Sequence, residues 1–339
     1  MKFSEFECFK VSMPQAHVAQ VLMASGRRGN PVGLKFLDEL GRVFDEVSAH
    51  ADVRAVVLAA DDKDFSFGLD LKDVAPLLMA GLQGGSAGHD ALERQGTAWQ
   101  QSLTRIAQCR QPVIAAVSGW CIGAGLELIA ACDVRLCSDD STFTLREVKL
   151  GIVSDLGGLQ RLPQLVSHGW LRQMAFTGDD FSAAQALQMG LVNATYQTPE
   201  QTRQAALAQA QRIAQNAPLV VAGIKKLLNA QSEATVQQSL REALLLNASL
   251  FQTPDFTEAM MATIQKRPAV FTGLMQAKPG ASQANEGGIS QALGAQLLAQ
   301  ASANHAGKFL IQFDLGTDGS LFLDTRISPV CVTAASDEK

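Results

Sequence analysis

The segment that most constrains the fold runs from Pro112 to Pro163. It opens with an apolar run rich in β-branched residues, Val113 to Val117, which ends at Ser118-Gly119. A glycine-interrupted turn, a short helical pattern and a second strand-like run, Val134 to Cys137, follow. Short apolar runs bounded by turn residues are typical of buried strands. The segment therefore predicts a strand, turn, helix and strand unit within an α/β fold.

Three carboxylates interrupt this pattern. Glu127 falls in an otherwise apolar helical run just after the glycine turn, and acidic residues are rarely buried without a partner or a function. Glu147 and Asp155 follow in a segment with few helix or strand signals. Three carboxyls near one apolar site would hold each other's pKa values apart, so that one is a base while another keeps its proton. The structural alternative is that Glu127 caps the helix and the other two lie on the surface.

The residues from Ile122 to Pro163 resemble the signature of the crotonase superfamily, the enoyl-CoA hydratases and isomerases. An earlier segment, Phe65 to Val74, is similar to the family's second motif. The resemblance extends from about Phe9 to Gly273. It implies a crotonase-like ββα spiral core over residues 1–200, a helical region that packs subunits and covers the pocket over residues 201–273, and an extension over residues 274–339.

The resemblance also implies roles for the three carboxylates. Two glutamates that activate water in the family's hydratases match Glu127 and Glu147. The position of Asp155 is usually glycine in those hydratases, whereas the dienoyl-CoA isomerases carry aspartate there, so the isomerase branch is the more similar one. An isomerase of this branch has aspartate where this chain has Glu127. Hydration of a 2-enoyl-CoA by Glu127 and Glu147 is therefore the alternative reaction.

An oxyanion hole is implied by the same resemblance. In the family, the backbone N–H groups that match those of Leu69 and Ala124 point at the thioester oxygen, where they stabilise the negative charge that develops. Because the donors belong to the main chain, alanine at position 124 in place of the family's usual glycine should be tolerated. Four neighbouring residues are expected to bind substrate: Ser66, Phe67, Gly68 and Gly123.

The expected function is the isomerisation of a 3,5-dienoyl-CoA to a 2,4-dienoyl-CoA, as in fatty-acid β-oxidation. Glu147 would take a proton from C2, Asp155 would return one at C6, and Glu127 would tune and position the pair. No metal or redox cofactor is expected, because proton transfer alone completes the reaction and CoA is part of the substrate. A CoA-binding or scaffold protein without catalysis is the alternative from a different class.

Composition limits the other possibilities. The net charge of −5 and the sequence pI near 5.6 give no reason to expect a nucleic-acid partner. The apolar stretch from Pro112 to Cys132 carries glycines and Glu127, so a buried strand and helix explain it better than a membrane span. The six cysteines form no CxxC pair, and together with an N-terminus that lacks a signal-length apolar core they favour reduced thiols in the cytoplasm.

The flanking segments predict further elements. Residues 7–23 predict two short strands joined at Pro14, and apolar residues at helical spacing predict a helix after Pro31. Val53 to Ala60 predicts a strand of a sheet that is covered on both faces. The glycine-rich residues 78–97 predict a mobile loop or a frayed helix.

Beyond Pro163 the pattern is helical. Ser182 is expected to cap a helix that stops at Gly190, and three or four helices are expected from about residue 200 to 265. A homotrimer or a dimer of trimers is implied by resemblance alone. Lys225-Lys226 and Lys266-Arg267 are candidates for the CoA phosphates, with a solvated helix face as the simpler interpretation. The extension predicts an Ala/Gln/Gly/Ser-rich linker and a β-hairpin of unknown role.

Overall fold

The protein divides into two compact units, Met1–Gly273 and Leu274–Lys339. The first unit contains all of the segments that carry the predicted site. No helix that the structure describes is both long and apolar enough to cross a membrane. The computed structural model describes residues 3–230, 233–251, 253–271, 310–314, 320–324 and 331–334.

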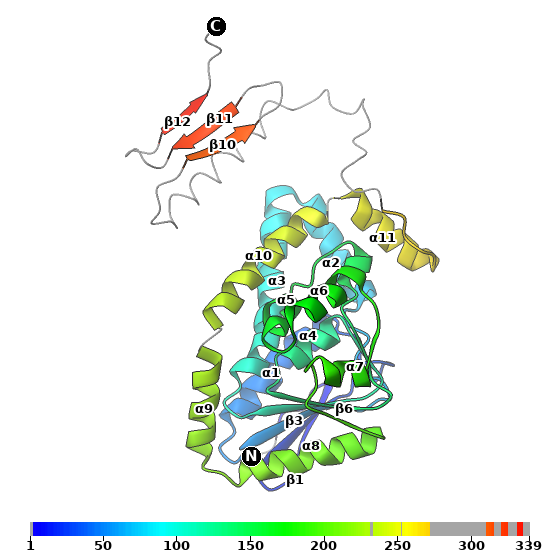
Figure 1. Cartoon of the computed structure of the whole chain (residues 1–339), viewed down its shortest axis with the longest axis vertical. Helices are drawn as coiled ribbons and strands as arrows, with labels where there is room; N and C mark the ends of the chain where they lie inside the picture. The colour runs from blue at the N-terminus through cyan, green and yellow to red at the C-terminus, as the bar shows by residue number, and fades with distance from the viewer. Residues whose placement is uncertain are drawn as a thin grey trace. The chain divides into compact units, whose positions relative to one another are not determined.

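The first unit is built on a six-stranded sheet (Figure 1). Its edge strand β1 pairs antiparallel with β2, and each later neighbour pairs parallel. Parallel neighbours need long crossover connections, which here contain the helices. The strands in sheet order are β1 (Phe9–Gln15), β2 (Val18–Met23), β3 (Ala55–Ala60), β4 (Val113–Val117), β6 (Val134–Ser138) and β9 (Ala194–Tyr196).

The sheet is covered on both faces, as the apolar run of β3 predicts. Alternate residues of β3 point to opposite faces, so Val57 packs in one apolar cluster and its neighbour Leu58 in the other. Helix α8 (Pro199–Ala214) covers the first face with three alanines at four-residue spacing. In Figure 1 this helix runs below the sheet, whereas α1, α3 and α4 lie above it. Small alanine side chains allow α8 to approach the strands closely.

A smaller sheet supports the turn that follows β4. It contains β5 (Trp120–Ile122), which pairs parallel with β7 (Thr142–Thr144), and β8 (Phe181–Ser182), which pairs antiparallel with β7. Strand β5 leads directly into α4 (Ala124–Ala130), and β6 follows α4. The predicted strand, turn, helix and strand unit is confirmed, with β5 as an additional strand inside the predicted turn.

The remaining elements of the first unit are helices and short 3₁₀ turns. Ser182 caps α7 through a reciprocal pair of hydrogen bonds with Gln185, and Gly190 follows the helix with a φ of +83°, so both predicted boundary signals are confirmed. The elements are α1 (Leu34–Ala49), α2 (Leu71–Gln83), α3 (Gly85–Gln108), η1 (Glu147–Leu150), α5 (Gly158–Arg161), η2 (Leu162–Gln164), α6 (His168–Thr177), α7 (Ala183–Gln188), α9 (Pro218–Ala230), α10 (Glu233–Leu250) and α11 (Pro254–Gln265).

Two local predictions need correction. The mobile-loop alternative for residues 78–97 was wrong, because these residues are helical apart from a break at Gly84, where α2 ends at Gln83 and α3 begins at Gly85. Leu92 of this region is buried, and tertiary packing of this kind outweighs the low helix propensity of glycine. Pro14 does not join the first two strands, because it lies within β1, where the pairing register shifts between Ser12 and Gln15. An edge strand tolerates a residue without an N–H.

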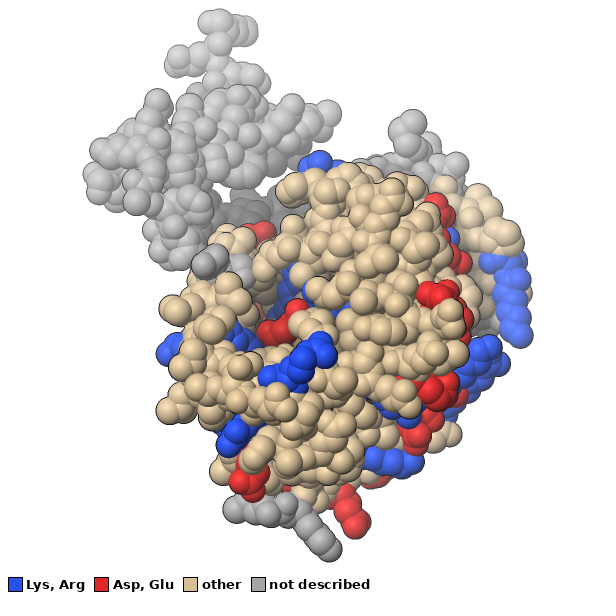
Figure 2. Space-filling model, turned by 60° about the horizontal axis from the view of Figure 1, so that its bottom comes forward, with Lys and Arg blue, Asp and Glu red and all other residues tan. Residues whose placement is uncertain are grey.

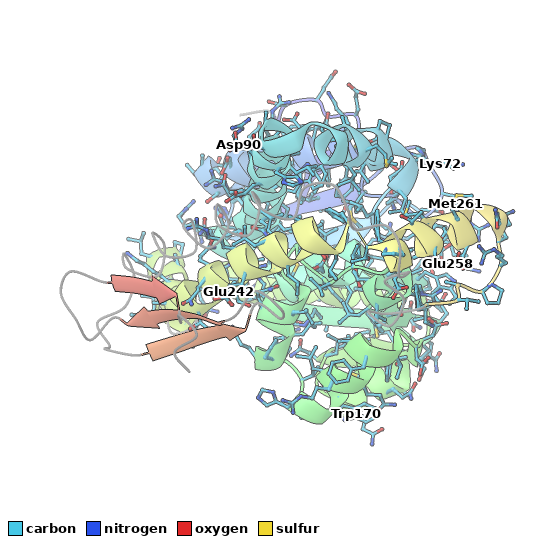
Figure 3. All side chains as sticks on the ribbon, turned by 90° about the horizontal axis from the view of Figure 1, so that it is seen from above. Lys72, Asp90, Trp170, Glu242, Glu258 and Met261 are labelled. Carbon is cyan, nitrogen blue, oxygen red and sulfur yellow. The ribbon has the colours of Figure 1, made fainter. Side chains whose placement is uncertain are left out.

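The last helices of the first unit return to the predicted site. Helix α10 packs against α3 and α5, and α11 packs against η1. Viewed from above in Figure 3, α10 and α11 cross the molecule between α2 and α3, marked by Lys72 and Asp90, and α6, marked by Trp170. The C-terminal helices therefore supply residues to a site that begins more than a hundred residues earlier in the sequence.

The second unit is described only at its strands. Strand β10 (Leu310–Asp314) pairs antiparallel with β11 (Ser320–Asp324), which pairs antiparallel with β12 (Cys331–Ala334). The residues that would connect β10 to β11, 315–319, and those of the predicted linker lie outside the described ranges. The hairpin and the linker remain predictions.

Candidate active site

The turn before α4 requires glycine at position 123. Gly123 has a φ of +48°, a region that residues with a Cβ rarely adopt. A Cβ at this position would also lie 2.6 Å from Oε1 of Glu147. The carboxyl of Glu147 therefore lies directly against the main chain at the start of α4.

Two backbone N–H groups are available beside this turn. Val32 forms a parallel bridge with Leu69 through the carbonyl of Gly68 and the N–H of Asp70, which leaves the N–H of Leu69 on the other side of its strand. A Cβ on Gly68 would lie 2.8 Å from the carbonyl oxygen of Ile122 and 3.5 Å from the nitrogen of Ala124, so the two turns are in contact. Within the described ranges, neither the Leu69 nor the Ala124 N–H donates a hydrogen bond. The structure thus brings together the two donors that the sequence predicts.

The three predicted carboxylates also meet here, although they come from different elements. Glu127 belongs to α4, Glu147 begins η1, and Asp155 lies in the loop before α5. The charge of Glu127 contributes to a raised pKa in both of the others. The interpretation in which Glu127 caps its own helix and the other two lie on the surface was wrong, because Glu127 is buried and bonded to the Asp155 loop, and the other two are partly buried.

Glu127 is an anchor for the loop that carries Asp155. Its Oε1 accepts hydrogen bonds from Oγ of Ser154 at 2.5 Å, from the N–H of Leu156 at 3.0 Å and from the N–H of Gly158 at 2.9 Å. Burial raises the pKa of Glu127, while these three donors lower it. Because the donors flank Asp155 on both sides, Glu127 fixes the course of the chain at that residue.

Glu147 has the more exceptional environment. Its Oε2 is buried and has no hydrogen-bond partner in the part of the chain that the structure describes. Burial, the charge of Glu127 and the charge of Asp155 raise the pKa of Glu147 to about 8, in that order of importance. A carboxyl of this kind readily exchanges a proton near neutral pH, as a general acid or base must.

Asp155 is held from two other helices. Its Oδ2 accepts a hydrogen bond of 2.6 Å from the side-chain amide of Asn247 in α10, and its carbonyl oxygen accepts one of 2.8 Å from the side-chain amide of Gln100 in α3. Burial and the charge of Glu127 raise the pKa of Asp155 to about 7, although the Asn247 bond lowers it. Neither Asn247 nor Gln100 was predicted, because a single uncharged polar residue in a helix gives no signal in the sequence.

Two cavities flank the loop from Ile152 to Asp155. One of about 210 Å³ borders Glu147 and Ser154, and a smaller one of about 40 Å³ borders Asp155 and Asn247. Both are lined mainly by apolar side chains, which suits an acyl chain. The other residues of the smaller cavity come from α2, α3, α11, η1 and the loops beside them: Leu69, Leu71, Leu78, Trp99, Leu150, Ile152, Leu156, Phe251, Phe256 and Met260.

The predicted substrate-binding residues at positions 66 and 67 have different surroundings. Ser66 is fully buried, and its hydroxyl donates to the carbonyl of Asn30 and accepts from the N–H of Gly68, so it supports the Gly68 turn from inside the protein. The ring of Phe67 lies 5.7 Å from the guanidinium of Arg28 and faces Gly29. Phe67 therefore borders a basic loop that was not predicted.

That loop lines a cavity of about 370 Å³ whose charged residues are Lys10, Arg27 and Arg28 together with Asp61 and Asp62. Arg27 forms an ion pair with Asp70, and one nitrogen of Arg28 lies 3.7 Å from Asp64. The side chain of Arg28 is 80% exposed, so its remaining donors are available to a phosphate group. Two adjacent arginines between glycines, immediately after β2, are the signal in the sequence that could have identified this loop. On the face that Figure 2 shows, basic side chains are dispersed among uncharged and acidic ones.

One member of each basic pair considered for the CoA phosphates is engaged elsewhere, whereas Lys226 and Lys266 are exposed, as a solvated helix face predicts. Lys225 is buried, and its Nζ lies 2.7 Å from Asp133 and 3.1 Å from the carbonyl of Gln111. Arg267 pairs with Glu258 through two hydrogen bonds. Lys225 is therefore neither part of a solvated helix face nor free to bind a phosphate, because it is buried in an ion pair with Asp133. Among the described residues, no three His, Cys, Asp or Glu side chains are arranged to hold a metal ion.

Comparison with known proteins agrees with this geometry. The family model described as enoyl-CoA hydratase/isomerase matches residues 14–274. A mitochondrial Delta(3,5)-Delta(2,4)-dienoyl-CoA isomerase of Dictyostelium discoideum is 34% identical over 255 residues, which cover 75% of this chain and 87% of the relative. A carnitinyl-CoA dehydratase of Citrobacter koseri is 34% identical over 251 residues, 73% of this chain and 92% of that protein.

Solved structures show the same fold. A crystal structure of an enoyl-CoA hydratase/isomerase from Xanthobacter autotrophicus Py2 superimposes with a TM-score of 0.67 at 26% identity, and covers 77% of this chain and 94% of that one. The family match ends at residue 274 and so leaves out nearly all of the second unit, Leu274–Lys339. The fold of the first unit, the arrangement of its turns and the extent of the family match together show that this chain belongs to the enoyl-CoA hydratase/isomerase family.

Proposed function

We propose that the protein is a double-bond isomerase that converts a 3,5-dienoyl-CoA to a 2,4-dienoyl-CoA. The observation that carries the proposal is the place of Asp155, a second titrating carboxyl beside an apolar cavity in the site of Glu147. A shift of two conjugated double bonds requires proton transfer at two carbons four bonds apart, and so two groups at different places. The named isomerase from Dictyostelium discoideum supports the same choice.

The reaction uses the two N–H groups and two of the carboxyls. The thioester oxygen accepts hydrogen bonds from the backbone N–H groups of Leu69 and Ala124. Ionised Glu147 takes a proton from C2, and the electron pair spreads over the two double bonds to give a dienolate with its negative charge on the thioester oxygen. Protonated Asp155 then gives its proton to C6. The double bonds end at C2 and C4, and exchange with water restores both carboxyls.

Glu127 acts on the other two carboxyls without touching substrate. Its Oε1 is occupied by three donors. Burial first, and then the charge of Glu127, raise the pKa of both Glu147 and Asp155 into the range where each can exchange a proton. Proton transfer needs no bound metal or redox group, and CoA enters as part of the substrate. Its phosphates are assigned to Arg28, which lies beside Phe67 and is the more exposed of the two arginines, whereas Arg27 already pairs with Asp70.

Hydration of a 2-enoyl-CoA is the second candidate. It is favoured by the electrostatic interaction of Glu127 with Glu147 in one site and by the equal identity to a dehydratase. Against it stands the position of Oε1 of Glu127, which three protein donors already surround, so that only Oε2 is left to hold a water molecule. Binding of CoA without catalysis is the third possibility. It does not explain why two carboxyls with a raised pKa, Glu147 and Asp155, lie in one site.

We propose an assembly and a cellular location from the exposed apolar surface of α9 and from the free cysteines. Helix α9 exposes a set of large apolar side chains that a monomer would leave in water: Leu219, Val220, Ile224, Leu227 and Leu228. Such a surface suits a subunit contact, so we assign a homotrimer or a dimer of trimers. We place the protein in the cytoplasm on the basis of its unpaired cysteines, of which Cys8, Cys109, Cys121, Cys132 and Cys137 are free.

The proposal is tested by a spectrophotometric assay with a 3,5-dienoyl-CoA and, separately, with a 2-enoyl-CoA. The wild-type protein should produce the conjugated 2,4-dienoyl chromophore. Asp155→Gly should abolish this activity, since no group remains to protonate C6. A protein that consumes only the 2-enoyl-CoA, and keeps that activity in Asp155→Gly, would be a hydratase.

A further inference from the structure

Asn247 makes contacts that go beyond those of an ordinary buried amide. It lies in α10 with 1% of its surface exposed. Its Nδ2 donates to Oδ2 of Asp155 at 2.6 Å and to the carbonyl of Val153 at 2.9 Å, and its Oδ1 accepts from the N–H of Val153 at 2.9 Å. All of these partners lie in the loop that precedes α5. One side chain from a distant helix therefore binds both the main chain and the carboxyl of this loop.

The orientation of the amide is fixed by its main-chain partner. A backbone N–H can only donate, so the group that faces the N–H of Val153 must be Oδ1. The NH₂ group then faces Asp155. In the reversed orientation, Oδ1 would face a carboxylate oxygen and Nδ2 would face an N–H, and both contacts would be repulsive. Val153 thus determines that Asp155 receives a donor.

A donor on Oδ2 makes the two oxygens of Asp155 different. Oδ2 already accepts the Asn247 N–H, and within the described ranges no other residue donates a hydrogen bond to the Asp155 side chain. A proton on the carboxyl is then favoured on Oδ1, because a proton on Oδ2 would compete with the N–H for the same lone pairs. Oδ1 is the oxygen that remains available for proton transfer.

We propose that Asn247 is a positioning residue for the reaction: it holds Oδ2 of Asp155 as an acceptor, so that the transferable proton is carried on Oδ1. This inference rests on the proposed isomerase function. The other groups around Asp155 do not duplicate the contact, because Glu127 from α4 and Glu147 from η1 are acceptors and Gln100 from α3 binds only the carbonyl of Asp155.

Loss of Asn247 should leave the loop in place. Glu127 still holds Ser154 and Leu156, and Gln100 still holds the carbonyl of Asp155. Asn247→Ala should therefore fold and bind substrate, yet lower kcat on the order of 100-fold with little change in KM, since a misplaced carboxyl transfers its proton poorly. Asn247→Asp, which keeps the side-chain size, should lose kcat as well, because two carboxyls would face each other.

The matched control is Asn229→Ala. Asn229 also donates from a helix to a distant main-chain carbonyl, that of Ala107 at 2.8 Å, but it lies in α9 away from the carboxylates. It should leave kcat and KM unchanged. Equal kinetics for Asn247→Ala and Asn229→Ala would overturn the inference, as would a loss confined to KM.

Carboxyl titration by ¹³C NMR separates this inference from the proposed function. Removal of the Asn247 donor should raise the pKa of Asp155 further, because that hydrogen bond lowers it in the wild type, and Asp155→Asn identifies the signal. An unchanged titration in Asn247→Ala would refute the assigned contact whatever the substrate is. If the wild type fails to isomerise dienoyl-CoA, the proposed function falls and takes the kinetic role of Asn247 with it, while a raised pKa would still support the contact.

Discussion

Oε1 of Glu127 lies 3.0 Å from the main-chain nitrogen of Leu156, the residue that follows Asp155. A carboxyl in the first turn of α4 thereby sets the position of a second carboxyl 28 residues later. After burial, its charge is the next largest cause of the raised pKa of both Asp155 and Glu147. The acid and base of the site are coupled through a third group that need not contact substrate.

Glu127→Gln should separate the structural and electrostatic roles of this residue. The amide oxygen can still accept from the N–H groups of Leu156 and Gly158, but the negative charge is gone. Since that charge raises the pKa of Glu147 and of Asp155, both should titrate at lower pH in the variant. The pH profile of kcat/KM should shift to more acidic pH. An unshifted profile would show that Glu127 acts only as a structural anchor.

The wild-type pH profile should be a narrow bell. Activity rises as Glu147, with a pKa of about 8, loses its proton, and falls as Asp155, with a pKa of about 7, loses its own. The active form has ionised Glu147 and protonated Asp155. Because the pKa of the acid, Asp155, is lower than that of the base, Glu147, only a minority of molecules have this form at any pH. Its fraction is largest between the two pKa values. A flat profile across this range would contradict the assigned roles.

Gly123→Ala should damage the site through two effects. The residue has a φ of +48°, and its new Cβ would lie 2.6 Å from Oε1 of Glu147. Strain at positive φ costs about 1–3 kcal/mol, and displacement of the base should reduce kcat on the order of 100-fold. Gly85→Ala is the matched control, because Gly85 has a φ of +58° with no atom within 4 Å of its added Cβ. It should lose stability alone, measured by denaturant unfolding.

Glu147→Gln should inactivate the enzyme and stabilise its fold at alkaline pH. The folded-state pKa of about 8 lies above the ordinary value of 4.5. The wild type therefore has its full stability below the ordinary value and loses part of it as pH rises through about 8. Glutamine does not ionise, so the variant should gain roughly 1–4 kcal/mol above that pH and little in acid. Urea unfolding at both extremes measures this, and an equal gain at both would refute burial as the cause.

Arg28→Gln and Lys225→Met should give opposite results. Loss of the exposed Arg28 should raise KM for acyl-CoA by about tenfold, more at low salt, with the fold intact. Lys225→Met leaves Asp133 without its cation and should cost about 3 kcal/mol of stability with KM unchanged. A raised KM in Lys225→Met, with Arg28→Gln unaffected, would assign the phosphates to α9 instead.

The sequence predicted the core of the fold because β3 and β4 are continuous apolar runs that suit a sheet covered on both faces. Glu127 could also be identified because it interrupts an apolar helical run, whereas Glu147, Asp155 and the two N–H donors were identified by the resemblance to the family. The sequence left the first half of α3 open between a mobile loop and a frayed helix, because this half is glycine-rich and mostly exposed. Its helical form depends on packing against α1 and α2.

The residues that support the site could not be predicted from the sequence. Asn247 meets Asp155 across 92 positions of sequence, and Arg27 and Arg28 meet the Phe67 loop across about 40. Contacts of this length depend on how helices cross a sheet, which local patterns do not encode. Lys225 was misjudged for the same reason, since its partner Asp133 comes from the turn between α4 and β6.

The central claim is that one carboxyl removes the proton at C2 while another delivers a proton at C6. The most direct test is NMR of the product formed from a 3,5-dienoyl-CoA in D₂O by the wild-type protein. Asp155 exchanges its proton with solvent between turnovers, so the account predicts a 2,4-dienoyl-CoA with deuterium at C6. A product with the C2 hydrogen transferred to C6, or no 2,4-dienoyl product at all, would contradict it.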